Sequence, residues 1–112
     1  MTREKHAFSD KKIIILVNED TQSEAEFLVM ALQQCGNVTT VGSHTAGSDG
    51  NVIYWKFPGG ITSTLSGIGI LYPDNTITQR IGIKIDHLIE STIKDYQRKK
   101  DAILDFVNFK GK

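Results

Sequence analysis

The first half of the chain alternates apolar and polar segments in an order that predicts an α/β fold. Residues Ile13–Val17 form a β-branched apolar run bounded by polar residues, which is typical of a parallel strand buried on both faces. After a polar turn at 18–23, apolar residues recur at helical spacing until Gly36, where we expect the helix to end. Residues 38–42 predict a second strand, so a right-handed βαβ unit is the expected topology.

The second half of the chain is expected to consist mainly of short strands and one helix. Three glycines in residues 42–50 predict a loop whose backbone needs positive φ or a close approach. Short extended segments follow at 52–57, 61–64, 68–72 and 77–85, and the first two are expected to form a hairpin around a Pro-Gly-Gly turn. Apolar residues between 93 and 107 predict a C-terminal helix with a charged outer face.

Size and charge indicate a single domain and argue against two classes of partner. The 112 residues carry 13 basic and 13 acidic side chains, and no Lys/Arg cluster alternates with aromatic residues as in a nucleic-acid groove. No apolar run approaches the roughly 18 residues of a membrane helix, and the first twelve residues lack an apolar signal core. We expect residues 1–11 to be a flexible N-terminal segment and residues 12–112 to form one unit.

Neither the cysteine nor the histidines indicate a metal or a cofactor. Cys35 is the single cysteine, which excludes an internal disulfide and a cysteine-based metal cluster, and we expect it to pack in the core. The histidines show no zinc-ligand spacing, and His44 is interpreted as a polar residue of the glycine-rich loop. Gly47 and Gly50 are expected to shape that loop, because no Lys-Ser/Thr follows them as a phosphate-binding loop requires.

Ser23 is the candidate nucleophile, because it stands where the predicted strand turns into the helix. The first turn of a helix supplies unpaired N–H groups and a positive dipole end for an oxyanion, and the N–H of Glu24 would be one donor. The structural alternative is a helix cap, since Thr21-x-x-Glu24 and Ser23-x-x-Glu26 both match a capping box. Capping serines outnumber catalytic ones, so spacing by itself favours the cap.

Four segments resemble, in order, blocks of the tail-specific (C-terminal processing) and tricorn-type serine proteases. Residues Leu16–Leu32 look like their nucleophile segment, Leu-Val-Asn/Asp followed by Thr/Ser-x-Ser-x-x-Glu and a helix, with Ser23 on the nucleophile. The other three matches are Val41–Gly47 to Val-Gly-Glu-Pro-Thr-x-Gly, Phe57–Gly60 to Leu-Pro-Gly-Gly, and Gln79–Asp86 to Gln-x-x-Gly-Ile-x-Pro-Asp. Their order and spacing are together fairly specific and cover residue 12 to the end. The resemblance implies an α/β fold of the crotonase/Clp-protease-like type, with additional short strands and a C-terminal helix.

The catalytic partners of Ser23 depart from the pattern of this family. Ser48 occupies the position of the lysine base of the tail-specific branch, and serine cannot act as a base at neutral pH. The resemblance then points to the tricorn-like branch, whose base is a histidine in the part of the domain before this chain begins. Gln79 falls close to that branch's acidic residue, where glutamine could hydrogen-bond without supplying charge. His44, Gly47, Ser48 and Gln79 are therefore the expected site loop beside Ser23.

The resemblance implies a serine-type endopeptidase that cleaves unfolded or C-terminally exposed polypeptide. The chain is expected to be the C-terminal part of the catalytic domain, inactive alone, with the N-terminal part of the same protein as its partner. The apolar sheet surface left exposed predicts self-association of the isolated chain. The alternative is a non-catalytic peptide-binding or assembly domain in which Ser23 only caps the helix. Relatives often act in the periplasm or outside the cell, which is an implication of the resemblance alone.

Overall fold

The computed structural model describes residues 10–110, and its centre is a small parallel sheet. Strands β1 (Ile13–Val17) and β2 (Val38–Gly42) pair in parallel from Ile13 opposite Val38 to Val17 opposite Gly42, with helix α1 (Glu24–Leu32) between them in sequence. This arrangement is the predicted βαβ order. A third strand, β5 (His87–Leu88), pairs in parallel with the other edge of β2, giving the order β1-β2-β5. Of the predicted flexible segment, residues 1–11, the first nine residues lie outside the described residues.

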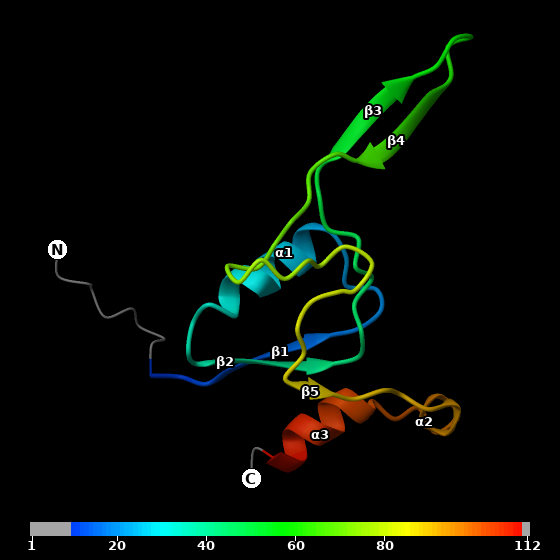
Figure 1. The fold of residues 1–112 in the computed structure, drawn as a ribbon. Helices are drawn as coiled ribbons and strands as arrows, with labels where there is room; N and C mark the ends of the chain where they lie inside the picture. Colours follow the sequence, from blue (N-terminus) through cyan, green and yellow to red (C-terminus); the bar gives the residue numbers. More distant parts are fainter. Residues whose placement is uncertain (1–9, 111–112) are drawn as a thin grey trace, which may run out of the picture.

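A two-stranded hairpin extends away from the parallel sheet. Strands β3 (Val52–Lys56) and β4 (Thr62–Ser66) pair antiparallel, which confirms the predicted hairpin, and Figure 1 shows them standing apart from the body of the molecule. All ten residues of the two strands are exposed. The turn Phe57–Gly60 forms the tip of the hairpin and is therefore remote from the other three family-like segments.

The core lies between α1 and one face of the parallel sheet. Val17 of β1 and the helix residues Val29 and Met30 are buried there, together with Tyr72 and Ile83 from the second half of the chain. The opposite face of β1 is open, because Ile14 and Leu16 are 45% and 44% exposed. The prediction that this strand is buried on both faces was therefore wrong for these residues: one layer of structure covers β1 and nothing described covers the other face.

The ends of the helices differ from the sequence-based expectation. Helix α1 ends at Leu32, four residues before Gly36, and tight turn bonds such as Cys35 N–H to the Leu32 carbonyl (2.9 Å) follow it. Cys35 consequently lies beyond the helix and is exposed, so its predicted place in the core was wrong.

The single C-terminal helix predicted between 93 and 107 is two helices, α2 (Ile93–Gln97) and α3 (Ala102–Lys110). They are separated at Lys99, whose φ of 53° is incompatible with a continuous right-handed helix.

Figure 1 shows α1 and α3 on opposite sides of the parallel sheet. Among residues 10–110, no helix combines the length and apolar character needed to cross a membrane.

The extended segments predicted at 68–72 and 77–85 are loops and turns. Their one strand-like contact is an isolated antiparallel bridge between Leu71 and Ile77. These segments still contribute to the core, since Ile83 belongs to it and Ile70 and Ile85 pack against it. Their apolar residues pack at the core without regular strand structure. No strand within the described residues pairs with these segments along a hydrogen-bonded ladder.

Candidate active site

Ser23 stands at a strained turn between β1 and α1. The chain leaves β1 through a turn closed by the Thr21 N–H to the Asn18 carbonyl (3.0 Å), and Ser23 then starts α1 as its N-terminal cap residue. Its backbone angles are φ 54° and ψ −124°, a combination that residues other than glycine seldom adopt. Such strain costs about 1–3 kcal/mol and persists where the surroundings hold it, most often at functional sites.

Glu26 holds this strained turn from inside the protein. The carboxylate is fully buried, and its Oε2 accepts the N–H of Ser23 at 3.2 Å. Ser23 and Glu26 form a capping box, in which each side chain faces the backbone N–H of the other residue, but only the contact from the Ser23 N–H to Glu26 has the geometry of a hydrogen bond. The hydroxyl lies on an exposed residue, so a group arriving from solvent or from another part of the protein can reach it.

The same carboxylate binds the glycine-rich loop. Oε1 of Glu26 accepts the Thr45 hydroxyl at 2.6 Å and the Gly47 N–H at 2.8 Å, while Oε2 accepts the Ser48 N–H at 2.9 Å. The N–H groups of Ser23 and Ser48 thus share one oxygen atom and lie within two hydrogen-bond lengths of each other. Residues far apart in sequence are brought together here by a single buried side chain.

Gly47 fits the loop against the segment that resembles the last family block. Its φ is 63°, and a Cβ atom there would lie 2.8–3.0 Å from backbone atoms of residues 80–82. Its carbonyl accepts the Arg80 N–H at 2.7 Å, and the Thr45 hydroxyl accepts the Ile83 N–H at 3.1 Å. The first, second and fourth family-like segments therefore meet around Ser23.

The start of α1 offers a donor for an oxyanion. Within the described part of the chain, the backbone N–H of Glu24 has no hydrogen-bond partner, and it points out of the first turn next to Ser23. Partial positive charge at a helix N-terminus adds to the pull of such a donor on an anion. The Glu24 N–H is therefore an unpaired donor next to Ser23, as expected for the first turn of a helix.

Two residues of the expected site loop, His44 and Ser48, have no side-chain bond to Ser23 among the described residues. His44 is exposed and lines a hollow of about 560 Å³ at the carboxyl ends of the parallel strands, together with Asn18, Glu19 and Ser43. No hydrogen bond among residues 10–110 connects the His44 ring to Ser23. The Ser48 side chain is exposed, and its bond to the site is made by the backbone. No cluster of three or more potential metal ligands occurs among these residues.

Asp49 is a buried acid of the loop that sequence reasoning missed. It is 4% exposed, and its Oδ1 accepts the Gly50 N–H at 2.8 Å. Burial raises the pKa of its carboxyl, and the nearby charge of Glu26 acts in the same direction. The Gln79 amide donates to the Asp49 carbonyl at 3.2 Å, so the residue predicted near an acidic position lies directly beside an acid. The only available signal was an aspartate directly after the position of the missing lysine.

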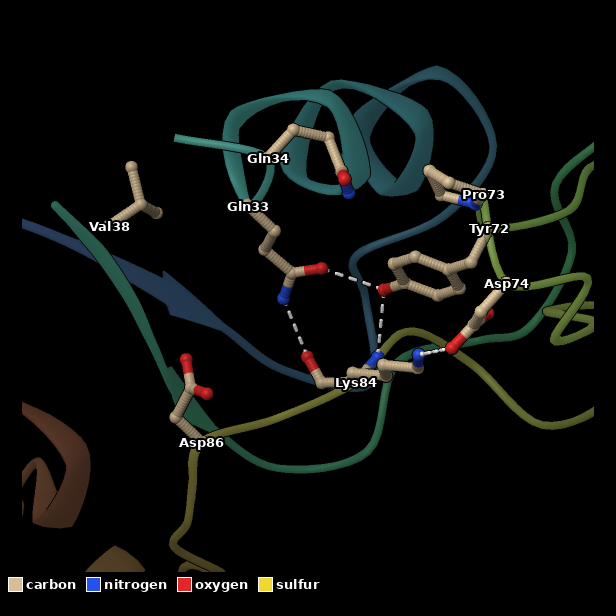
Figure 2. A pocket seen from close by; sticks show the side chains of 8 residues that line it. All are labelled: Gln33, Gln34, Val38, Tyr72, Pro73, Asp74, Lys84 and Asp86. Carbon is tan, nitrogen blue, oxygen red and sulfur yellow. Dashed lines mark hydrogen bonds and ion pairs between the residues drawn. The ribbon is translucent and has the colours of Figure 1, made fainter. Parts of the chain in front are cut away.

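A second hollow, of about 310 Å³, lies at the other end of α1 and is shown in Figure 2. The Gln33 amide donates to the Lys84 carbonyl at 2.7 Å and accepts the Tyr72 hydroxyl at 2.7 Å. The Lys84 ammonium binds the Asp74 carboxylate at 2.6 Å and holds the pKa of that carboxyl well below its usual value. The polar groups lining this hollow are hydrogen-bonded or ion-paired to one another. They connect the end of α1 to the 72–86 segment.

An exposed serine at a strained strand-to-helix turn beside a parallel sheet is the arrangement of α/β enzymes with a serine nucleophile. A comparison with family sequence profiles matches residues 1–89 to "Peptidase family S41". Because this match spans most of the chain, the protein belongs to peptidase family S41. A comparison with curated protein sequences found no match.

Solved structures of peptidases share this fold. A Parabacteroides merdae protein solved as a candidate peptidase aligns with a TM-score of 0.76 at 24% identity, covering 84% of this chain and 30% of its own. Mature CPAF complexed with lactacystin aligns with a TM-score of 0.71 at 26% identity, covering 86% of this chain and 19% of its own. Mature CPAF alone gives 0.70 at 26% identity, with 86% and 18% coverage. The chain thus spans less than a third of the length of these proteins.

Proposed function

We propose that this chain is the C-terminal part of the catalytic domain of a serine-type endopeptidase, with Ser23 as its nucleophile. The observation that carries the proposal is the conformation of Ser23: its backbone is strained, its N–H is tied to Glu26, and its hydroxyl makes no cap hydrogen bond. A residue that served only as a cap would adopt the extended backbone that is usual at this position, as Thr92 does at the start of α2. Membership of peptidase family S41 supports the same conclusion.

The proposed reaction is acyl transfer from a polypeptide substrate. The Ser23 Oγ attacks the peptide carbonyl while a base takes the hydroxyl proton, and the Glu24 N–H stabilises the resulting oxyanion. The base then returns the proton to the leaving amine, and water hydrolyses the acyl-enzyme by the same route. Ser48 cannot act as the base, so we assign this role to a histidine outside the described residues, as in the tricorn-like branch.

The proposed histidine belongs to the part of the catalytic domain that precedes this chain. Two features support such a part: the chain spans less than a third of the length of its structural neighbours, and none of residues 10–110 forms a layer over the exposed hairpin β3–β4. We propose that the preceding part covers the apolar side of this hairpin and completes a crotonase-like domain. On its own the chain is then inactive, and the uncovered hairpin drives self-association.

The alternative is a peptide-binding or assembly domain that has lost catalysis. Ser48 in place of the lysine favours it, because no base for Ser23 occurs among the described residues. The two functions make opposite predictions for turnover by the full-length protein.

The deciding experiment measures cleavage of an unfolded polypeptide by the full-length gene product. Ser23→Ala is expected to reduce kcat by at least about 10³-fold, because the covalent step disappears. Ser66→Ala, which removes an exposed hydroxyl in β4, is the matched control and should leave kcat unchanged. Turnover that survives Ser23→Ala would contradict the proposal, as would a wild-type protein without turnover.

A further inference from the structure

The strongest unexplained feature of the molecule is one oxygen of Asp49. Oδ1 of this carboxylate is bonded to the Gly50 N–H, whereas Oδ2 is buried and has no hydrogen-bond partner among residues 10–110. Buried carboxylate oxygens are almost always paired, since an unpaired one loses its hydration without compensation. The arrangement calls for a donor from outside the described residues.

Asp49 lies directly beside the nucleophile region. Its neighbour Ser48 shares the Glu26 Oε2 atom with the backbone of Ser23, at 2.9 and 3.2 Å. Glu26 itself needs no further donor, because both of its oxygens already accept two hydrogen bonds. A donor that arrives at this place would therefore find Asp49 as the available carboxylate.

Asp49 is held rigidly enough to direct such a donor. The Gln79 amide binds the Asp49 carbonyl at 3.2 Å, and Gly50 packs so closely that a Cβ atom there would lie 2.4 Å from the Ile68 carbonyl oxygen. Gln79 is thus used to fix the backbone of the loop, and the charge that glutamine lacks is supplied by the residue it binds. Glu26 is the charged group of α1 that acts on Asp49, and Gln79 and Ile68, which pack against Gly50, are uncharged.

We propose that Asp49 is the positioning residue of the catalytic base, with its Oδ2 accepting the N–H of the imidazole that the proposed function requires. In this arrangement one ring nitrogen of the histidine donates to Asp49, which leaves the other nitrogen unprotonated and directed to Ser23. When the Ser23 Oγ attacks, its proton moves to that nitrogen, and the carboxylate stabilises the imidazolium without taking the proton. This inference rests on the proposed function.

The test is the pH profile of kcat/KM for the full-length protein carrying Asp49→Asn. The amide keeps the size of the side chain but holds the imidazole less well and does not stabilise its cation. We expect kcat to fall by at least about 10²-fold with little change in KM, and the acid limb of the profile to move to lower pH. Asp20→Asn removes the same charge from an exposed residue of the neighbouring turn and should change neither quantity.

The outcomes separate this inference from the function on which it rests. Active wild-type protein with an Asp49→Asn variant of unchanged kcat and unchanged profile would overturn the role of Asp49 and leave the peptidase intact. A uniform loss without movement of the acid limb would also overturn it, since a merely structural defect has that effect. Wild-type protein without turnover would contradict both, because there would be no base to position.

Discussion

The N–H of Ser23 and the carboxylate of Glu26 are joined by a 3.2 Å hydrogen bond that fixes the strained turn before α1. Because Glu26 also binds Thr45, Gly47 and Ser48, the turn and the glycine-rich loop are positioned by one buried side chain. The glutamate three residues after Ser23 therefore has a physical role in this chain, because it sets the geometry of two loops at once.

Glu26→Gln is expected to destabilise the chain strongly. In this variant an NH₂ group replaces one carboxylate oxygen and faces the hydrogen-bond donors that this oxygen had accepted. Because these buried donors are then left unpaired, we expect a loss of about 2–4 kcal/mol in the free energy of unfolding. Urea denaturation of the purified chain measures the loss. Glu24→Gln, at an exposed neighbouring position, is the matched control and should stay within about 0.5 kcal/mol of the wild type. Equal effects of the two variants would show that Glu26 does not hold the loops.

Ser23→Ala should leave the stability of the chain nearly unchanged. Since the hydroxyl makes no cap hydrogen bond, we expect a change below about 0.5 kcal/mol, whereas a true capping residue loses about 1 kcal/mol. Thr92→Ala provides that comparison, because the Thr92 side chain accepts the Asp95 N–H at the start of α2. Ser23→Gly should raise stability by up to about 1 kcal/mol, because glycine tolerates the positive φ. A large loss in Ser23→Ala would favour the cap.

Gly47→Ala tests whether the loop needs a residue without a side chain. The new methyl group would lie 2.8–3.0 Å from backbone atoms at a φ of 63°, so we expect a loss of about 2 kcal/mol or more. Gly36→Ala is the control, because no atom lies within 4 Å of a Cβ there and its φ is not positive. Thermal or urea unfolding of the two variants should differ clearly, and similar values would contradict the tight packing of this loop.

The stability of the chain should carry a pH dependence that originates at Asp49. Burial raises the pKa of the folded state above the unfolded value, so the folded chain binds the proton more tightly. The ionised group therefore destabilises the fold at neutral pH, and this penalty is relieved as pH falls through the folded pKa toward the unfolded value near 3.9. The difference in urea midpoint between Asp49→Asn and the wild type should shrink as pH falls from about 7 to 4. A constant difference would contradict the burial of this carboxylate.

The apolar side of the hairpin should make the isolated chain associate. Ile53 pairs with Leu65, and side chains alternate between the two sides along β3. Ile53, Trp55 and Leu65 therefore lie on the same side of the hairpin, and each of these residues is 42–56% exposed. A two-stranded hairpin is at best marginally stable in water without a layer on that side. Sedimentation should show self-association that Trp55→Ser weakens and Tyr54→Ser, on the opposite side, does not. A monomeric wild-type chain would contradict this account.

Local patterns were sufficient for the elements that are determined locally. The apolar run of β1, the helical spacing of α1 and the Pro-Gly-Gly turn of the hairpin each specify their structure within a few residues, and all three were predicted from the sequence. Strand β5 was not, because two residues have no periodicity and its pairing depends on the register of β2. The break between α2 and α3 depends on one positive φ at Lys99, which a helical pattern does not reveal.

Sequence reasoning singled out Ser23 but not the buried acids around it. The role of Ser23 as nucleophile stays a prediction: the order of strand, turn and helix left a helix cap open, and the family resemblance favoured catalysis. The role of Glu26 extends beyond the predicted capping box, because its bonds to Gly47 and Ser48 exist only once the loop has folded back on α1. Asp49 gave only a weak signal, its place directly after the position of the missing lysine, since burial and an unpaired oxygen are properties of the packed structure.

The most direct test of the central claim is labelling of the full-length protein with a serine-directed fluorophosphonate, followed by peptide mass spectrometry. The account predicts one adduct on Ser23, no label after Ser23→Ala, and unchanged labelling after Ser66→Ala. Absence of an adduct on Ser23 in a folded wild-type protein, or an adduct on another serine, would contradict the assignment of Ser23 as the nucleophile.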